Sequence, residues 1–263
     1  MAQLITGLDI GGAHLKAAQV TQAGHVVAAL QLPCALWQGL DRLEQALAEA
    51  KRRLGPIDQV AITMTGELAD LFPDRATGVA RLVEAALTAL PRARPRLWAG
   101  QHGFVPPAEA AGLAAAIASA NWLASAGLAA ARCGDGLFVD LGSTTTDILV
   151  LAGGAVRAEG TTDRARLASG ELVYTGLTRT PLMALCAEAP FAGRRVALMN
   201  ELFATSADLF RVLGTLPEDA DQHPAADGGA KTSEASARRL ARMIGADLAN
   251  LSLIHISEPT RRS

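Results

Sequence analysis

The sequence predicts an α/β protein built from two lobes, and three observations lead to this expectation. Segments with the alternating pattern of β-strands lie between segments with the apolar spacing of helices. Half of the 263 residues are hydrophobic, which is enough for a sizeable core. An acidic, glycine-tipped hairpin also occurs twice, and the second copy, opened by Asp140, starts 131 residues after the first, opened by Asp9. A repeat of this kind favours two related lobes.

The first lobe is expected to span residues 1–105. Alternating patterns predict its strands, and apolar residues at helical spacing predict its helices. One helix should end at Gly55 and another before Pro91, because both residues favour helix termination. In chain order, the expected elements are strands at 3–10, 13–21 and 25–32, a helix at 39–55, a strand at 58–67, a helix at 77–90 and a strand at 95–100.

An alanine-rich stretch at 106–132 is expected to form a helix between the lobes. It is long enough to cross a bilayer, but it contains Glu109 and Asn121, and alanine partitions weakly into lipid. The second lobe should then occupy residues 133–250. Its expected elements are three strands within 136–160, a strand at 170–176, helices at 181–187 and 196–213, a Pro/Gly-rich loop at 217–232 and a final helix from 233.

The C-terminal segment 251–263 breaks the helical pattern that precedes it. Residues 251–261 resemble the translation of a transposase-type sequencing adapter, so we exclude the segment from the fold as non-native. This interpretation implies that the native chain continues past Asn250 and that the second lobe is C-terminally truncated.

Composition argues against several classes of protein. The net charge of −2 disfavours a nucleic-acid coat or a membrane-surface protein, which usually carry a basic excess. No basic segment precedes an apolar core at the N-terminus. The cysteines Cys34, Cys133 and Cys186 form no CxxC pair, which favours a reduced cytoplasmic protein with buried thiols.

Both hairpins have the composition of a phosphate-binding turn, in which backbone N–H groups and hydroxyls bind phosphate oxygens. An aspartate would repel phosphate unless a divalent cation lies between them, so Asp9 and Asp140 predict a bound divalent cation. Lys16 should return along the next strand and add a positive charge. The turn residues are Gly11, Gly12, Ala13 and His14 in the first copy, and Gly142, Ser143, Thr144, Thr145, Thr146 and Asp147 in the second.

These paired turns resemble the phosphate-1 and phosphate-2 motifs of the actin, sugar-kinase and Hsp70 superfamily. The motifs DIGGAHLKAA, ITMTGELAD, SANWLASA, DLGSTTTDI, LVYTGLTRTPLMAL and MNELFATSADLFRVLG together resemble the hydantoinase/oxoprolinase-like family. More narrowly, they are similar to its branch linked to methanofuran biosynthesis and tetrahydromethanopterin-dependent one-carbon transfer. Two departures stand out, because His14 replaces a more common Asn and Leu71 a more common Cys.

The resemblance implies two ribonuclease H-like lobes of the actin-like ATPase type, with a ligand cleft between them. It also implies a synthase that joins a furfuryl diphosphate to the phenol of a tyramine derivative and releases pyrophosphate. Mg²⁺, Lys16 and backbone donors would stabilise the leaving group, and a carboxylate would accept the phenol proton. We expect Glu67 to be this base, with Asp70 and then Asp208 as further candidates. The expected partners are thus a small-molecule diphosphate and a phenolic amine.

Two alternatives remain open. The same turns suit an ATP-dependent hydrolase or kinase of the hydantoinase/oxoprolinase type, because ATP also presents a metal-bound diphosphate. A non-catalytic nucleotide-binding scaffold would need the turns but no base. The sequence does not define the amine substrate or the oligomeric state.

Overall fold

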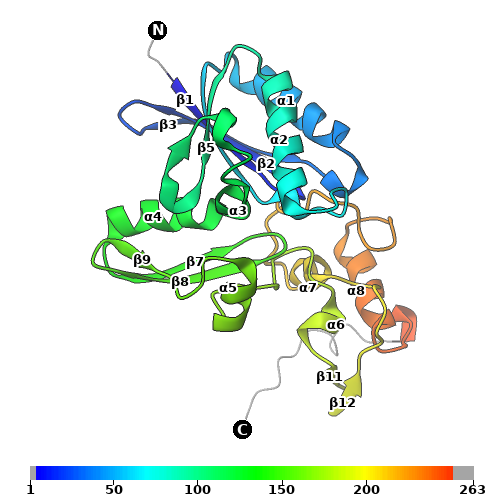
Figure 1. Cartoon of the computed structure of the whole chain (residues 1–263). Coiled ribbons are helices and arrows are strands. Elements are labelled where there is room, and N and C mark those ends of the chain that lie inside the picture. Colours follow the sequence, from blue (N-terminus) through cyan, green and yellow to red (C-terminus); the bar gives the residue numbers. More distant parts are fainter. Residues whose placement is uncertain (1–3, 251–263) are drawn as a thin grey trace. The chain divides into compact units, whose positions relative to one another are not determined.

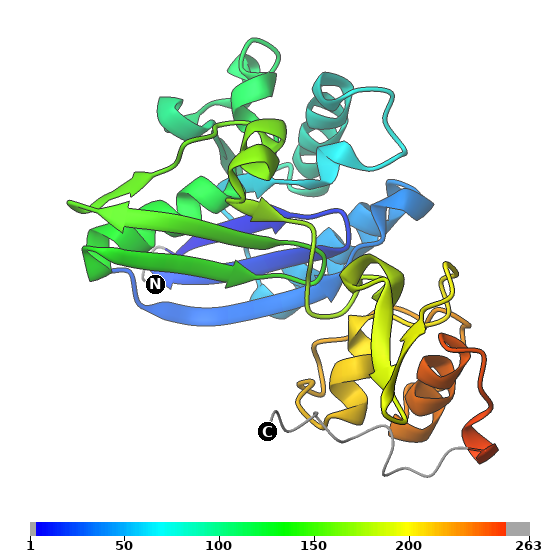
Figure 2. The same ribbon diagram turned by 90° about the horizontal axis from the view of Figure 1, so that it is seen from below.

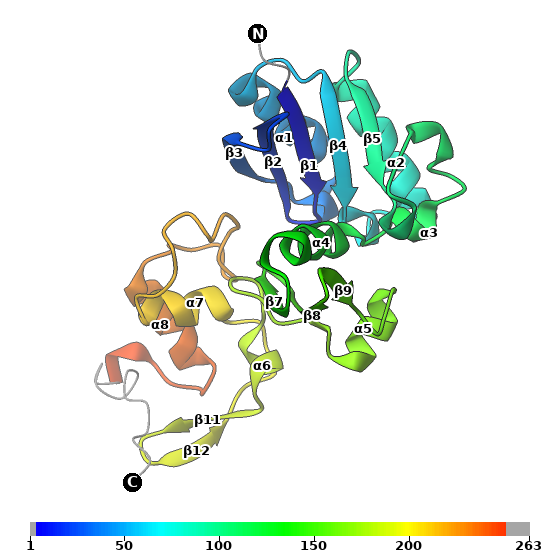
Figure 3. The ribbon, with the colours of Figure 1, turned by 90° about the vertical axis from the view of Figure 1, so that its left-hand side faces the viewer.

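A six-stranded sheet with the order β3-β2-β1-β4-β5-β6 organises the first part of the chain in the computed structural model, which describes residues 4–250 (Figures 1 and 3). Strand β2 is antiparallel to β1 and β3, whereas β1, β4 and β5 are parallel. This order and polarity are those expected of a ribonuclease H-like lobe. The strands are β1 (Leu4–Ile10), β2 (His14–Thr21), β3 (Val26–Pro33), β4 (Gln59–Met64), β5 (Arg94–Trp98) and β6 (Phe104–Val105).

Helices α1 (Asp41–Leu54) and α2 (Arg75–Ala89) pack on the sheet and on each other. Their apolar residues recur at helical spacing, so one face of each helix is buried. Leu43, Leu47 and Leu82 lie in one core cluster with Leu8 and Ile10 of β1. Two short 3-10 helices, η1 (Leu36–Gln38) and η2 (Gly66–Leu68), follow β3 and β4. The strands and helices predicted for 3–100 are confirmed, with their ends shifted by a few residues.

The alanine-rich stretch is not the single helix that we expected. It forms η4 (Pro107–Glu109), α3 (Ala114–Ile117) and α4 (Asn121–Cys133), after η3 (Gly100–His102). The break before α4 falls at Ser119, whose positive φ of 51° is incompatible with a right-handed helix. Among residues 4–250, no helix has the length and apolar character that crossing a membrane requires.

A second sheet has the order β10-β8-β7, with β9 also paired to β8. Its strands are β7 (Gly136–Leu141), β8 (Thr146–Ala152), β9 (Ala155–Arg157) and β10 (Leu172–Val173). The described residues divide into two compact units: one takes residues 4–138 and 149–165, and the other takes 139–148 and 166–250. Strands β7 and β8 therefore contribute to both units. In the first unit, Trp122 and Ala126 of α4 pack with Leu149 and Leu151 of β8.

The rest of the second unit contains helices α7 (Ser206–Val212) and α8 (Ser233–Arg242), which pack side by side (Figure 2, yellow and orange). The helix predicted at 196–213 is wrong over its first half, because α7 begins only at Ser206. A hairpin precedes it, made by β11 (Glu188–Phe191) and β12 (Arg194–Ala197). Its two turn residues, Ala192 and Gly193, have φ of 48° and 76°. Positive φ at both central residues matches a type I′ turn, which usually carries Asn or Gly. Because position 192 is an alanine, the sequence did not predict this turn.

Of the other predictions for 133–250, the three strands within 136–160 are confirmed as β7, β8 and β9, and the final helix begins at Ser233 as expected. The strand expected at 170–176 is limited to Leu172–Val173. The loop predicted at 217–232 has no helix or strand. Other short helices are α5 (Asp163–Ser169), which we did not predict, α6 (Leu182–Leu185) and η5 (Leu248–Asn250). The segment 251–263 that we attribute to a sequencing adapter lies outside the described residues.

Candidate active site

Three neighbouring strands place Asp9, Lys16 and Thr63 side by side on one face of the first sheet. Asp9 lies opposite Lys16 of β2 and opposite Thr63 of β4. Side chains alternate along a strand, so the flanking Leu8 and Ile10 enter the core while Asp9 faces the other way. Lys16 Nζ lies 3.5 Å from Asp9 Oδ2, and Thr63 Oγ1 donates to Oδ1 at 3.2 Å.

Asn121, the first residue of α4, completes the surroundings of Asp9. Its amide Nδ2 lies 3.4 Å from each Asp9 oxygen, and its Oδ1 accepts the N–H of Trp122 at 2.8 Å. The second hydrogen bond fixes which end of the amide faces Asp9. Sequence reasoning assigned no role to Asn121 or Thr63. The available signal was their presence in the SANWLASA and ITMTGELAD motifs.

The first turn closes through a backbone hydrogen bond from Gly11 N–H to the His14 carbonyl at 2.9 Å. A Cβ on Gly11 would lie 2.9 Å from that same carbonyl, so the turn requires glycine there. The side chains of Ala13 and His14 are buried, so they enter the interior of the first unit. Cys34 N–H donates to the Ala13 carbonyl at 2.8 Å and ties the turn to the end of β3.

The carbonyl of Gly12 is bound in the same way, by the N–H of Leu36 at 3.0 Å.

Of the three cysteines, Cys34 is fully buried, and burial raises the pKa of its thiol to about 12. Cys133 and Cys186 are exposed, so the expectation of buried thiols is wrong for both. Cys133 ends α4 and Cys186 follows α6, where neither is covered by a core.

Glu67 is a buried carboxyl group beside the first turn. Its residue is 1% exposed, and Oε1 accepts a hydrogen bond from Ser119 Oγ at 2.7 Å. Within residues 4–250, Oε2 has no hydrogen-bond partner. Burial raises the pKa of Glu67 above its usual value, and the Ser119 hydrogen bond and the charge of Arg75 oppose this shift in part. A buried carboxyl group with a perturbed pKa is a candidate for proton transfer.

Close backbone packing holds Glu67 in place. Thr65 N–H donates to the Ile10 carbonyl at 3.0 Å, which joins the end of β4 to the first turn. A Cβ added to Gly78 of α2 would lie 2.8 Å from the Glu67 Cα, so only glycine permits this approach. Ser119 and Asn121 are two residues apart and contact Glu67 and Asp9 respectively, so one short segment connects both carboxyl groups. Asp70, our second candidate base, is exposed in the turn that follows η2.

The second turn repeats the closure of the first. Gly142 N–H donates to the Thr145 carbonyl at 2.9 Å. A downstream segment then covers the turn, because Leu177 N–H donates to the Gly142 carbonyl at 2.9 Å and Arg179 N–H to the Ser143 carbonyl at 2.9 Å. Gly176 allows this contact, since a Cβ there would lie 2.5 Å from the Ser143 backbone.

The other predicted residues of the second turn differ in their contacts. Asp140 is half-buried in β7. Thr146 Oγ1 donates to the Thr175 carbonyl at 2.6 Å, which gives that hydroxyl a structural partner. Asp147 Oδ1 accepts a hydrogen bond at 2.5 Å from Arg166 Nη2, and the Arg166 side chain is only 2% exposed.

Asp208, our third candidate base, lies in a network of structural contacts in the second unit. Its Oδ1 accepts hydrogen bonds from Ser236 Oγ at 2.8 Å and from Arg239 Nη1 at 3.0 Å. Its Oδ2 accepts the N–H of Thr205 at 3.0 Å and completes a capping box at the start of α7. Both oxygens are thus occupied, which favours a role in joining α7 to α8.

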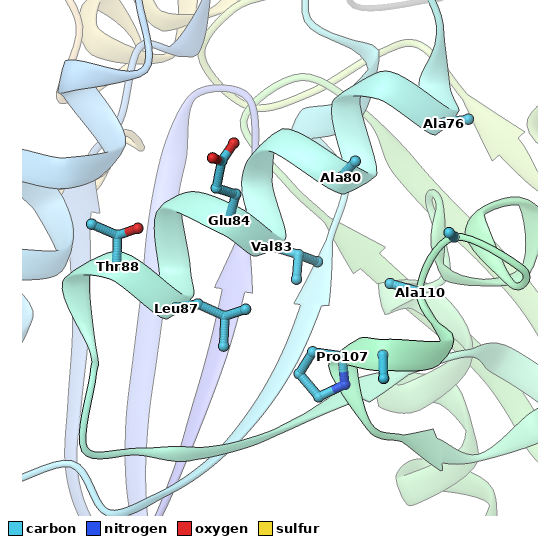
Figure 4. A pocket seen from close by; sticks show the side chains of 10 residues that line it. Ala76, Ala80, Val83, Glu84, Leu87, Thr88, Pro107 and Ala110 are labelled. Atoms are coloured by element: carbon cyan, nitrogen blue, oxygen red, sulfur yellow. The ribbon is translucent and has the colours of Figure 1, made fainter.

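The first unit also has a groove of about 360 Å³ between α2 and η4 (Figure 4). Its lining is mostly apolar, with Val83 and Leu87 of α2 facing Pro107, and Glu84 and Thr88 as its polar members. None of the predicted site residues is among the described residues that line it. The groove therefore does not supply the chemistry that the two turns predict.

The described residues contain no group of three or more His, Cys, Asp or Glu side chains that could hold a metal ion. Mg²⁺ commonly binds through one or two carboxylates together with phosphate oxygens and water. Asp9 fits that mode, because its hydrogen bonds and ion pair of 3.2–3.5 Å are long and its side chain is 23% exposed. Its carboxylate can therefore still accept a metal or metal-bound water.

The strand order of the first unit and the paired acidic turns define an α/β protein of the actin-like ATPase type. The profile of the hydantoinase/oxoprolinase family matches residues 58–259. The chain is also 32% identical, over 94% of its length and 73% of the relative's, to (4-{4-[2-(gamma-L-glutamylamino)ethyl]phenoxymethyl}furan-2-yl)methanamine synthase from Methanocaldococcus jannaschii. The chain therefore belongs to the hydantoinase/oxoprolinase family.

A second relative and two solved structures are also similar to this chain. A synthase of the same name from Methanococcus vannielii is 34% identical over 116 residues, which are 44% of this chain and 52% of that protein. Among solved structures, a ROK family glucokinase from Streptomyces griseus has a TM-score of 0.40 and 15% identity, covering 92% of this chain and 76% of the glucokinase. The ethanolamine utilization protein EutJ from Carboxydothermus hydrogenoformans has a TM-score of 0.37 and 17% identity, covering 60% of this chain and 51% of EutJ. The chain thus spans about half to three quarters of these proteins.

Proposed function

We propose that the chain acts as a transferase that joins a furfuryl diphosphate to the phenol of a tyramine derivative and releases pyrophosphate. The observation that carries this proposal is the 32% identity to a synthase whose name describes a phenoxymethyl-furan, which is an aryl–alkyl ether. In the reaction, the bond between the furfuryl carbon and the diphosphate oxygen breaks, and a bond from the same carbon to the phenol oxygen forms. The diphosphate leaves with the bonding electrons, and the phenol loses a proton.

Glu67 is our candidate for the base that accepts this proton. Its raised pKa makes it a better proton acceptor than an ordinary carboxylate, and Oε2 carries no hydrogen bond within residues 4–250. Burial near the reacting groups would also exclude water, which competes with the phenol for the furfuryl carbon. Ser119 would hold Glu67 through Oε1, so that Oε2 faces the phenol.

Asp9 and Lys16 would act on the leaving group. Lys16, half exposed beside Asp9, would place a positive charge on a phosphate oxygen. Asp9 would bind Mg²⁺ directly or through water, with Asn121 and Thr63 fixing its orientation. Bound Mg²⁺ would neutralise the charge that develops on the departing diphosphate. The second turn, opened by Asp140, has the same type of closure and similar donors, and would bind phosphate oxygens in the same way.

The test incubates this chain, and in parallel the M. jannaschii relative, with Mg²⁺ and either a furfuryl diphosphate plus tyramine or ATP. We expect pyrophosphate release that depends on the phenol, together with formation of the ether detected by mass spectrometry. Release of orthophosphate from ATP, without ether formation, would contradict the proposal and favour the ATP-dependent hydrolase or kinase. Binding of a nucleotide with no turnover would instead favour the scaffold.

A further inference from the structure

The second turn has no lysine at the position that Lys16 occupies in the first turn. In the first copy, Lys16 lies on the strand that leaves the turn, opposite Asp9. The corresponding position 131 residues later is Asp147, an acid. Asp147 forms an ion pair with the buried Arg166. The two opposite charges cancel, so the pair adds no net positive charge to the turn. If the second turn binds phosphate, its cation must come from elsewhere.

Arg179 lies against the second turn and is held there by both its backbone and its side chain. Its N–H donates to the Ser143 carbonyl at 2.9 Å, and its guanidinium Nη1 donates to Thr144 Oγ1 at 3.3 Å. Thr178 N–H also donates to the Ser143 carbonyl, at 3.2 Å. These contacts place the guanidinium beside the Thr144 hydroxyl of the turn.

The surroundings of Arg179 suit an anion. The side chain is half-buried, and burial lowers its pKa, while the nearby Tyr174 opposes that shift. A guanidinium remains charged even when its pKa falls, so partial burial leaves a cation with reduced hydration. Its planar donors match the oxygens of a phosphate group in a bidentate geometry. A phosphate that replaced the lost hydration would therefore bind strongly.

We propose that Arg179 contacts the diphosphate at the second turn and supplies the positive charge that Lys16 supplies at the first. This inference rests on the proposed function, because it assumes that the turns hold a diphosphate. Thr144 is then a positioning residue, which orients the guanidinium through its hydroxyl. The ligand class is a metal-bound diphosphate, whether it is pyrophosphate, a diphosphate ester or part of ATP.

The test measures binding of inorganic pyrophosphate and of ATP, each with Mg²⁺, to the whole chain by isothermal titration calorimetry. We expect Arg179→Gln to weaken pyrophosphate binding by about tenfold or more. Arg179→Lys should weaken it by a smaller factor, because lysine keeps the positive charge but lacks the planar, bidentate donors of the guanidinium. Thr144→Val should weaken it about three-fold, the order of one lost neutral hydrogen bond. Arg194→Gln, an exposed arginine on β12, is the matched control and should leave binding unchanged.

The outcomes separate this inference from the proposed function. Equal pyrophosphate affinity in the wild type and Arg179→Gln would overturn the role of Arg179 and leave the synthase proposal standing. ATP binding that Arg179→Gln weakens, with no pyrophosphate binding or ether formation, would keep Arg179 and contradict the synthase. Failure of the wild type to bind either ligand would contradict both. Thermal unfolding of each variant shows whether a loss reflects the site, and Arg179→Lys serves if Arg179→Gln does not fold.

Discussion

The two acidic turns share a closing backbone hydrogen bond but have different surroundings. Gly11 bonds to His14 in the first and Gly142 to Thr145 in the second, both at 2.9 Å and at corresponding positions. The first turn lies in a six-stranded sheet, where Lys16, Thr63 and Asn121 surround Asp9. The second is covered by residues 175–180, and its later strand pairs an acid with a buried arginine.

This difference teaches that a short repeated motif specifies a turn but not the side chains that meet it. The glycine and its closing hydrogen bond are local, because they involve residues three apart. Asn121, in contrast, reaches Asp9 across 112 residues of sequence. The base candidate Glu67 belongs to the first turn, so we expect the two turns to contribute unequally to catalysis.

Replacing Glu67, beside the first turn, with Gln should lower the rate of pyrophosphate release more than any of the other substitutions proposed for the two turns. Glutamine keeps the shape and can still accept the Ser119 hydrogen bond, but it cannot accept a proton. We expect phenol-dependent pyrophosphate release to fall by about 10²–10⁴-fold, the usual contribution of a general base. In the wild type, activity should rise with pH as Glu67 loses its proton through its raised pKa. Retained activity in Glu67→Gln, with the same pH profile, would remove Glu67 from the chemistry.

Asp9→Asn and Asp140→Asn test the inequality of the turns directly. Asp9→Asn should lower turnover by on the order of 100-fold, because it removes the charge that would hold Mg²⁺ next to Glu67. Asp140→Asn should cost less, since Asp140 lies in the turn without the base. The measurement is the rate of pyrophosphate release at several Mg²⁺ concentrations. Equal losses in the two variants would indicate that the turns act as equivalent halves.

Glycine substitutions compare how tightly each turn is packed. Gly176→Ala places a Cβ 2.5 Å from the backbone of Ser143, which cannot move without opening the second turn, so we expect a loss of about 2–3 kcal/mol in the free energy of unfolding. Gly66→Ala beside the first turn meets the Leu36 Cδ1 methyl most closely and the Ile10 carbonyl at 3.1 Å, and it should cost less because the end of a leucine side chain can shift more easily than backbone. Gly127→Ala in α4 meets nothing within 4 Å, so this control should stabilise the helix by about 0.5–1 kcal/mol. Urea unfolding measures all three, and the reverse order of Gly176 and Gly66 would contradict the packing argument.

The raised pKa of Glu67 also predicts a pH dependence of stability. The folded chain holds the Glu67 proton at pH values where the unfolded chain has released it, so this contribution is complete below the unfolded pKa and is lost as pH rises through the folded pKa. Glu67→Gln removes the effect. Relative to the variant, the stability of the wild type should therefore fall as pH rises above the usual range of a glutamate pKa, measured by urea unfolding. Parallel stability curves for the two proteins would contradict the shift.

Lys16→Ala should have the smallest effect on stability. Its ion pair with Asp9 is 3.5 Å long and the lysine side chain is 51% exposed, so solvent screens the interaction to about 0.5 kcal/mol or less. Turnover should nevertheless fall about tenfold, because the lysine acts on the leaving group. Lys51→Ala in α1 is the control, since this lysine is also exposed but lies away from the turns. A large loss of stability in Lys16→Ala would assign the lysine a structural role instead.

The sequence predicted the elements that depend on neighbours along the chain. The helical spacing of Leu43 and Leu47 predicted α1, and the glycine-tipped turns predicted both hairpins. It did not predict the break at Ser119, because nothing in the local sequence shows that a serine must adopt a positive φ to reach Glu67. The sequence also did not predict the buried partners of Asp208, since Arg239 lies 31 residues further along the chain. One local clue was present, because Thr205 and Asp208 have the spacing of a capping box.

Cys34 gives the chain an internal reporter for the first turn. Its thiol is buried and held protonated, and its own N–H binds Ala13 at the tip of the hairpin, whereas the other two cysteines face solvent. A maleimide reagent should therefore modify Cys133 and Cys186 rapidly, and Cys34 only when the structure around the first turn opens. The rate of that slow third addition, followed by mass, would give the opening rate, and a bound diphosphate should suppress it.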